Sequence, residues 1–229
     1  MFYVKHHPGR GLDDEQNARL GQLLELLATD PTAPTAVTEP DAAFETHVLD
    51  SLTALDVAAP RPGDAVVDIG SGAGLPGIVL AIAMPRARFD LVESVERKCD
   101  FLRRAVEQIG LQNAAVVCER VEQWATERGR EAYELALARA VAPLPTLVEY
   151  AAPLLKTDGR LVAWKGKRDP EDEAAARRAA ELVGMREATV AVVEGSHNRH
   201  LHLYEKVAPT PARYPRRPGM ARKRPLGSG

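Results

Sequence analysis

The sequence lacks several features that would place it in other protein classes. It has only two cysteines among 229 residues, and Cys99 and Cys118 have no close spacing, which argues against a disulfide framework or a zinc ribbon. No apolar segment is long enough to span a membrane, and the N-terminus has no apolar signal-peptide core. We therefore expect a cytoplasmic protein with no membrane contact and no bound metal.

An excess of charge of one sign is also missing. The net charge is −2, so the chain as a whole carries no basic signal for nucleic acid. The charge is unevenly spread, because the stretch from Arg213 to the C-terminus holds six cations and no acid. This proline- and arginine-rich tail is expected to build no core and to be disordered on its own. It is either a solubilising tail or, as its arginine density favours, a phosphate-binding arm.

The length suits one domain with additions, or two small domains, and the apolar share of 45% supports a sizeable core. We expect an N-terminal helical extension over residues 1–60, a core over 61–208 and the basic tail over 209–229. Within the extension, residues 1–11 are predicted to be irregular. Asp13 is predicted to cap a helix that runs to about Ala28.

A second helix is predicted from about Asp41 to Leu55. Its residues His47, Asp50 and Ser51 are spaced i, i+3, i+4, so they share one helix face. From this spacing alone, an ordinary exposed face is the favoured interpretation.

The most informative stretch runs from Asp64 to Gly77. An apolar run interrupted by Asp68 leads into a loop with four glycines, and an apolar helix follows. Strand, glycine loop and helix open a Rossmann-like unit. Residues 72–77 fit the dinucleotide pattern G-x-G-x-x-G, but that match alone is weak. An acid two residues before alternating glycines at 70, 72 and 74 is the pattern of S-adenosylmethionine (SAM) sites.

Later strand ends supply further candidates. Glu93 ends the second predicted strand, about twenty residues after the glycine loop. At that place a carboxylate can accept hydrogen bonds from both ribose hydroxyls. The alternative is that Glu93 is a solvated strand end. Val121 and Glu122 follow the third predicted strand, and their backbone can lie along the edge of an adenine ring. Arg139 and Lys165 end the fourth and fifth strands at the same carboxyl edge.

The remaining pattern alternates strands and helices and finishes with two strands joined by a short connection, which must be antiparallel. This describes an α/β, Rossmann-like fold: the class I SAM-dependent methyltransferase, with a mostly parallel seven-stranded sheet and an antiparallel last strand. The helices are predicted at 96–108 and 170–183. The strands after Glu93 are predicted at 114–120, 133–140, 160–167, 188–193 and 200–207.

The acceptor of the methyl group can be narrowed. Enzymes that methylate exocyclic amines usually carry an Asp- or Asn-Pro-Pro-aromatic motif after the fourth strand, where this chain has Arg139-Ala140-Val141-Ala142. Neither cysteine has the setting of a cytosine-C5 nucleophile. The remaining acceptors need little activation, and guanine N7, which is unprotonated at neutral pH, requires mainly alignment.

The chain resembles the bacterial 16S ribosomal RNA guanine-N7 methyltransferases, the RsmG or GidB family, over nearly its whole length. The stretch from Asp68 to Gly77 (DIGSGAGLPG) is close to the family's cofactor loop, and residues 47–51 (HVLDS) resemble its R-H-x-x-D-S helix. Thr46 departs from this pattern by standing where the family usually has arginine. Further matches are Glu93-Ser94, Arg97-Lys98, Phe101-Leu102, Arg120-Val121-Glu122, Arg139-Ala140, Lys165-Gly166, Arg199-His200-Leu201, Tyr214-Pro215-Arg216 and Lys223-Arg224-Pro225-Leu226.

The resemblance implies methyl transfer from SAM to guanine N7 of 16S rRNA in the 30S subunit or its precursor. It places the helix face around His47 in the functional site. Together, motifs and resemblance assign cofactor binding to Asp68, Gly70, Gly72, Leu75, Glu93, Val121, Glu122 and Arg139. The methyl-transfer cleft is assigned to Arg139, His47, Asp50, Ser51, Lys165 and Arg199. RNA contact is assigned to Arg120, Arg216, Arg217, Arg222, Lys223 and Arg224.

Three alternatives remain open. One is a SAM methyltransferase for a small molecule or a protein, and another is an NAD-dependent oxidoreductase. The third is a non-catalytic RNA-binding module that has kept only the fold. Because guanine N7 lies in the narrow major groove of A-form RNA, the target base must sit in a loop or be extruded. We expect a monomer that acts on a folded ribonucleoprotein.

Overall fold

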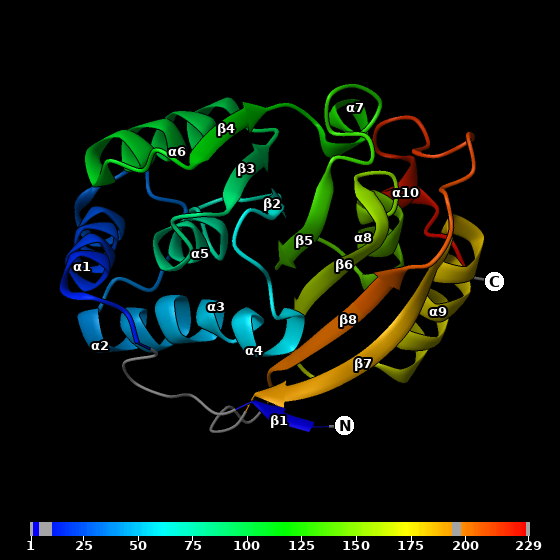
Figure 1. Cartoon of the computed structure of the whole chain (residues 1–229), viewed down its shortest axis with the longest axis horizontal. Helices are drawn as coiled ribbons and strands as arrows, with labels where there is room; N and C mark the ends of the chain where they lie inside the picture. Colours follow the sequence, from blue (N-terminus) through cyan, green and yellow to red (C-terminus); the bar gives the residue numbers. More distant parts are fainter. Residues whose placement is uncertain (1, 5–10, 194–197, 228–229) are drawn as a thin grey trace.

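The computed structural model describes residues 2–4, 11–193 and 198–227. An eight-stranded sheet runs through the middle of the molecule with helices on both sides (Figure 1). The strand order is β1-β7-β8-β6-β5-β2-β3-β4. The strands are β1 (Phe2–Val4), β2 (Ala65–Ile69), β3 (Arg88–Glu93), β4 (Ala114–Cys118), β5 (Tyr133–Arg139), β6 (Leu155–Lys165), β7 (Met185–Val193) and β8 (His200–Lys206).

Seven of these strands form the predicted mostly parallel sheet, and β8 is antiparallel to both β6 and β7 as expected. The prediction that residues 1–11 are irregular is wrong for Phe2–Val4, which pairs in parallel with Ala191 to Val193 at the edge of the sheet. Three residues are too few to show a strand pattern in the sequence. Residues 5–10 lie outside the described part of the chain.

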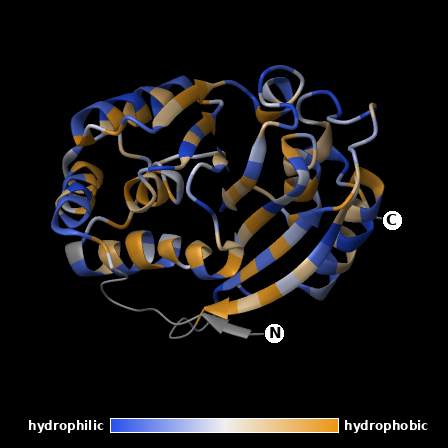
Figure 2. Ribbon diagram, in the orientation of Figure 1, coloured by the Kyte–Doolittle hydropathy of each residue, from blue (hydrophilic) through white to orange (hydrophobic). Residues whose placement is uncertain are grey.

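The helices fall into two layers that each bury one face of the sheet. One layer holds α1 (Asp14–Thr29), α5 (Gly77–Ala83), α6 (Glu96–Ile109) and the helical turns of residues 40–58. The other holds α8 (Leu144–Ala151), α9 (Pro170–Val183) and the short α10 (Met220–Lys223). In Figure 2, α5 carries almost no hydrophilic colour whereas α6 alternates, because α5 is buried all round and α6 exposes one face.

Local sequence signals explain where the main helices begin and end. Asp13 caps α1 by accepting a hydrogen bond from the Gln16 amide, as predicted. Gly110 ends α6 with a left-handed φ of 73°, a conformation that favours glycine. Asp169 caps α9 in the same way as Asp13 caps α1. These local signals therefore mark where α1 and α9 begin and where α6 ends.

The predicted helix over residues 41–55 is present, but it is not one regular α-helix. The chain instead forms α2 (Pro40–Ala43), a π-helical turn η1 (Phe44–Leu49), α3 (Asp50–Leu52) and α4 (Ala54–Ala58). The amide of Asp50 donates to the carbonyl of Glu45, the i→i+5 bond of a π-turn. His47, Asp50 and Ser51 on this segment are buried, so the expectation of an ordinary exposed face is wrong.

The C-terminal segment (residues 208–227) is ordered on the protein, so the expectation of a disordered tail without a core is wrong over that range. Tyr214 and Ala221 are 5% and 2% exposed and join the core beneath α8 and α9. Arg216 forms a paired hydrogen bond with Glu149, with N–O distances of 2.7 Å and 2.5 Å. The segment is held by its own two buried side chains and by Glu149 of the distant helix α8. No local sequence pattern predicts these contacts.

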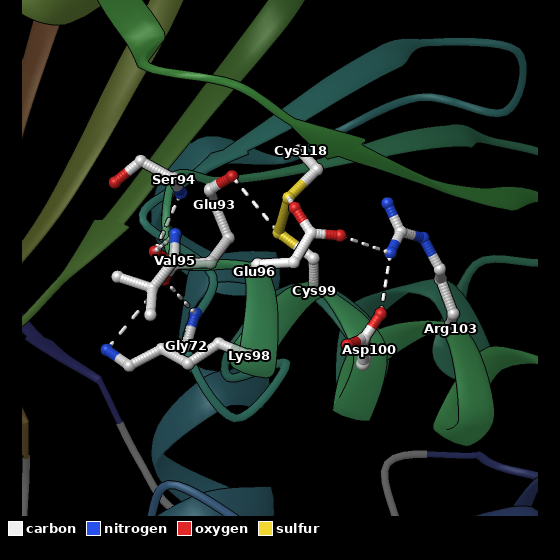
Figure 3. Close-up of a disulfide and its surroundings, with 10 residues drawn as sticks. All are labelled: Gly72, Glu93, Ser94, Val95, Glu96, Lys98, Cys99, Asp100, Arg103 and Cys118. Atoms are coloured by element: carbon white, nitrogen blue, oxygen red, sulfur yellow. Dashed lines mark hydrogen bonds and ion pairs between the residues drawn. A yellow bond between two sulfur atoms is a disulfide. The ribbon is translucent and has the colours of Figure 1, made fainter.

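The two cysteines are bonded to each other, which corrects the expectation drawn from their separation. Helix α6 runs away from the end of β3, and β4 returns beside it, so Cys99 and Cys118 come to a Cα–Cα distance of 5.8 Å. Figure 3 shows the bond between the first turn of α6 and the end of β4. The fold supplies a proximity that the 19-residue separation does not suggest.

No helix in residues 2–4, 11–193 or 198–227 combines the length and apolar character required to cross a membrane. Over the same residues, no three His, Cys, Asp or Glu side chains are grouped so that they could hold a metal ion.

Candidate functional site

A pocket of about 240 Å³ opens at the carboxyl ends of β2, β3, β4 and β5. In open parallel sheets, ligands bind at this edge. Residues from the glycine loop, the ends of three further strands and the C-terminal segment line it. They are Ile69, Gly70, Val92, Glu93, Ser94, Val95, Lys98, Glu119, Arg120, Val121, Glu122, Ala140, Val141, Tyr150 and Arg222.

Glu93 is a buried acid on the pocket wall and not a solvated strand end. It is 6% exposed. Its Oε2 accepts from the Gly72 amide at 3.2 Å, and its Oε1 accepts from the amides of Ser94 and Val95 at 2.7 and 3.0 Å. Figure 3 shows these groups converging on the carboxylate, with the Lys98 ammonium 3.9 Å away. These bonds hold the carboxylate in one orientation.

The glycine loop lies against the turn that follows β5. Gly70 has a φ of 69°, and a Cβ built on it would come within 2.8 Å of Val141. Glycine is therefore required here both by the backbone conformation and by the close approach. Gly70 lines the pocket, whereas Gly72 and Leu75 are not among its lining residues.

Asp68 lies beneath the loop, 1% exposed, and is not among the lining residues. Its Oδ2 accepts from the Gly77 amide at 3.1 Å, and its Oδ1 has no hydrogen-bond partner within the described structure. Burial raises the pKa of this carboxyl from 3.8 to about 7. Asp68 thus fixes the loop onto the start of α5.

The far side of the pocket is formed by α7 (Val121–Trp124) and its neighbours. Val121 and Glu122 are 9% and 6% exposed and both line the pocket. Oε1 of Glu122 accepts a hydrogen bond from the amide of Gly219 at 2.8 Å. Burial, with Glu122 nearby, raises the pKa of Tyr150 to about 12. Apart from Arg222, which was assigned to RNA, sequence reasoning gave no signal for the pocket residues contributed by α8 and the C-terminal segment.

A second polar group forms where Arg139, at the end of β5, meets the helical turns of residues 40–58. Nη1 of Arg139 donates to Asp50 Oδ2 at 2.9 Å and to the carbonyl of Thr46 at 3.0 Å. Nε of Arg199 lies 3.0 Å from the other oxygen, Asp50 Oδ1. Burial lowers the pKa of Arg139, and Asp50 opposes that change. One carboxylate therefore holds two guanidinium groups from distant strands.

His47 and Ser51 flank this cluster from inside. His47 Nε2 lies 3.1 Å from the carbonyl of Val37, which only accepts, so Nε2 carries the ring proton. Its Nδ1 has no hydrogen-bond partner among the described residues. Burial lowers the pKa of His47, so the ring is neutral at pH 7. Ser51 donates to the carbonyl of His47 and is completely buried.

Lys165 lies at the same edge but in a separate contact. Its Nζ is 3.3 Å from Asp172 Oδ2, on α9, and 3.4 Å from the carbonyl of Ala142. Lys165 pairs with His200 across β6 and β8, one residue beyond Arg199. The sheet therefore brings Arg139, Lys165 and Arg199 to one edge, and only the two arginines share a partner.

The cations assigned to RNA contact differ in their surroundings. Arg120 lines the pocket. The Arg216 guanidinium is occupied by Glu149 and by the carbonyl of Arg224. The other members of the set are exposed on the C-terminal segment: Arg217, Arg222, Lys223 and Arg224.

Comparisons with known proteins show the family of the chain. A family model described as rRNA small subunit methyltransferase G (GidB) matches residues 16–202. The chain is 46% identical over 199 residues to the ribosomal RNA small subunit methyltransferase G of Rubrobacter xylanophilus, covering 83% of this chain and 76% of that protein. It is 41% identical over 224 residues to the protein of the same name from Chloroflexus aggregans, covering 95% and 93%.

Solved structures agree on the fold. A SAM-dependent methyltransferase from Aquifex aeolicus superimposes with a TM-score of 0.58 at 18% identity, covering 80% of this chain and 97% of that one. A geranyl diphosphate methyltransferase in complex with GPP and sinefungin gives 0.59 at 13% identity, covering 85% and 100%. The predicted class I methyltransferase fold is confirmed, with β1 as an added edge strand.

Proposed function

Because the chain belongs to the family of rRNA small subunit methyltransferase G, whose members are SAM-dependent methyltransferases, we propose that it transfers the methyl group of SAM to N7 of a guanine in 16S rRNA. One observation carries the proposal furthest. Ala140 and Val141 line the pocket, and Arg139, the residue directly before them, belongs to the arginine cluster around Asp50. A nucleoside pocket and a cationic site thus meet at one turn of the chain.

The residues around the pocket fit SAM. The Glu93 carboxylate, held by three amides, suits the two ribose hydroxyls as an acceptor. Val95, Val121 and Val141 supply apolar surface for a planar ring. Gly70 lets the backbone approach a ligand closely. When bound, SAM supplies an electrophilic methyl group on a sulfonium.

Asp68, Gly72 and Leu75 support the pocket from behind. Gly72 donates its amide to Glu93 and so orients the acid that faces the ligand. Asp68 receives the Gly77 amide and ties the loop to α5. We propose that these three residues act on the cofactor through the shape of the loop.

Alignment is the main catalytic task, because the N7 lone pair of guanine is free at neutral pH. Neither oxygen of Asp50 is available as a base, since each is paired with an arginine. His47 donates from Nε2 to a backbone carbonyl and supports the turn that carries Asp50. We propose that Arg139 and Arg199 hold the target nucleotide, and that Asp50 fixes their positions and offsets their charge.

The substrate is a folded ribonucleoprotein. The near-neutral chain offers little general attraction for naked RNA, and its C-terminal segment carries exposed cations with no acid among them. The 30S subunit or its precursor therefore suits the enzyme better than free RNA, and Lys165 lies at the edge that would face it. We propose that the chain acts as a monomer.

Labelled SAM incubated with purified 30S or 50S subunits that lack the modification tests the proposal. We expect label in 30S and none above background in 50S. Equal labelling of both subunits would contradict the proposed acceptor. Labelling of neither, while SAM still binds, would show that the acceptor is another molecule.

A further inference from the structure

The cofactor pocket is closed on one side by the C-terminal segment, far in sequence from the glycine loop. We propose that this segment is part of the SAM site, with Arg222 as a cofactor-binding residue and Gly219 as the group that positions Glu122. The proposal rests on the proposed function in taking SAM as the ligand. Three sets of contacts join the segment to the pocket.

The first contact is that of Arg222 itself. Its side chain lines the pocket, and its Nη2 donates to the carbonyl of Val141 at 2.7 Å. Val141 also packs against Gly70 of the glycine loop. The guanidinium is therefore fixed over the turn between β5 and α8 and keeps its remaining N–H donors for a ligand.

The second contact orients Glu122. Gly219 donates its amide to Oε1 of Glu122 at 2.8 Å, across 97 residues. Gly219 has a φ of 82°, which places this amide at the start of α10 and favours glycine. Because the Gly219 amide binds Oε1, the Glu122 carboxylate is held in one orientation, and its second oxygen has a fixed position. Tyr150 lines the pocket beside it.

The third set of contacts makes the segment rigid enough for this task. Arg216 binds Glu149 through two hydrogen bonds, and the buried hydroxyl of Thr146 donates to the carbonyl of Ala221 at 3.1 Å. Both partners lie on α8, which also contributes Tyr150 to the pocket. The segment and α8 therefore form one packed unit along the pocket.

A consequence is coupling between the two substrates. Arg217, Lys223 and Arg224 are exposed on the segment whose contacts close the pocket. If rRNA phosphates bind these cations and steady α10, SAM binds to a more ordered pocket, and by linkage bound SAM strengthens RNA binding by the same factor.

Isothermal titration of SAM into the full-length protein, without RNA, tests the inference. We expect Arg222→Ala to weaken SAM binding at least about tenfold, a loss in the range of one hydrogen bond to a charged group. The matched control is Lys223→Ala, the next residue on the same helix, which should leave the SAM affinity within about twofold. The same control variant should weaken binding to 30S subunits and flatten its salt dependence.

Each outcome decides a separate point. If the native protein binds SAM and both Arg222→Ala and Arg222→Lys bind it equally well, the inference is wrong while the proposed function stands. If the native protein binds no SAM, both fail. Thermal unfolding without ligand is the check on folding, and Arg222→Lys, which keeps the charge and the stem, provides the test should the alanine variant be unstable.

Discussion

Asp50 and Arg139 lie 89 residues apart in the chain and 2.9 Å apart in the fold, between Oδ2 and Nη1. Both are largely buried, with side chains 7% and 12% exposed. The second carboxylate oxygen holds Arg199, and the indole of Trp164 donates to the Asp50 carbonyl at 3.0 Å. Asp50 is therefore positioned by its surroundings before any substrate arrives, and it positions two arginines in turn.

Replacing Arg139 with alanine should lower methyl transfer by roughly a hundredfold or more, the loss typical of a preorganised charged donor. The cost to the free energy of unfolding should be about 1–3 kcal/mol, because Asp50 keeps Arg199 as a partner. Initial rates with 30S subunits and urea unfolding measure the two effects. Arg186→Ala is the control, since Arg186 is an exposed arginine that pairs with the surface acid Glu205. Activity at the native level in Arg139→Ala would remove Arg139 from the mechanism.

Replacing Asp68 with asparagine should change how stability depends on pH. The folded pKa of about 7 lies above the unfolded value near 3.8, so this carboxyl destabilises the fold increasingly as pH rises from about 4 to about 7. An amide keeps an acceptor for Gly77 and has no charge. At about 1.4 kcal/mol for each pH unit between the two pKa values, the variant should gain up to about 4 kcal/mol relative to the native protein between about pH 4 and about pH 8.

Denaturant unfolding of the ligand-free Asp68→Asn protein at several pH values measures this gain. Parallel stability curves for the native protein and the variant would show that Asp68 is ionised throughout and that its burial is offset by contacts.

Removal of Arg216 should unfold the C-terminal segment. Glu149 is 1% exposed, so Arg216→Ala leaves a buried carboxylate without its partner, at a cost of about 3–5 kcal/mol. Arg217→Ala, at the exposed neighbouring position, should change stability by less than about 0.5 kcal/mol. Limited proteolysis followed by mass spectrometry should find early cleavage within residues 208–227 only in Arg216→Ala. Equal protection of both variants would show that the segment is held by its apolar contacts alone.

The bond between Cys99 and Cys118 gives a prediction for reducing conditions. Closing a loop across a 19-residue separation stabilises the folded protein by about 3 kcal/mol in the chain-entropy description. A reductant should therefore lower the melting temperature of the native protein by roughly 6–12 °C and leave Cys118→Ser unaffected. Thiol titration under denaturing, non-reducing conditions should find no free thiol. Two reactive thiols and a reductant-insensitive melting temperature would contradict the bond.

Much of the sheet and the cofactor loop could be predicted, because these parts carry local signals. Helix α9 has the predicted bounds, since Asp169 caps its start and Gly184 its end. Glu93 lies at the pocket, as its distance from the glycine loop suggested. Gly70 adopts the positive φ that its place in the loop required.

Features that depend on distant partners could not be predicted. The C-terminal segment is poor in apolar residues, and its order comes from Glu149 and Glu122 on other elements. The turn holding His47 and Asp50 is buried against partners on distant strands, among them Arg139 on β5 and Trp164 on β6. Tyr150 gave no signal, because its place at the pocket follows from the packing of α8 and from no motif.

The central claim is that guanine N7 of 16S rRNA accepts the methyl group, and nucleoside analysis tests it most directly. 30S subunits lacking the modification are incubated with labelled SAM and the enzyme, and the 16S rRNA is then digested to nucleosides and separated. We predict that the label elutes with 7-methylguanosine and is absent when the enzyme carries Arg139→Ala. Label in any other nucleoside, or in a ribosomal protein, would contradict the account.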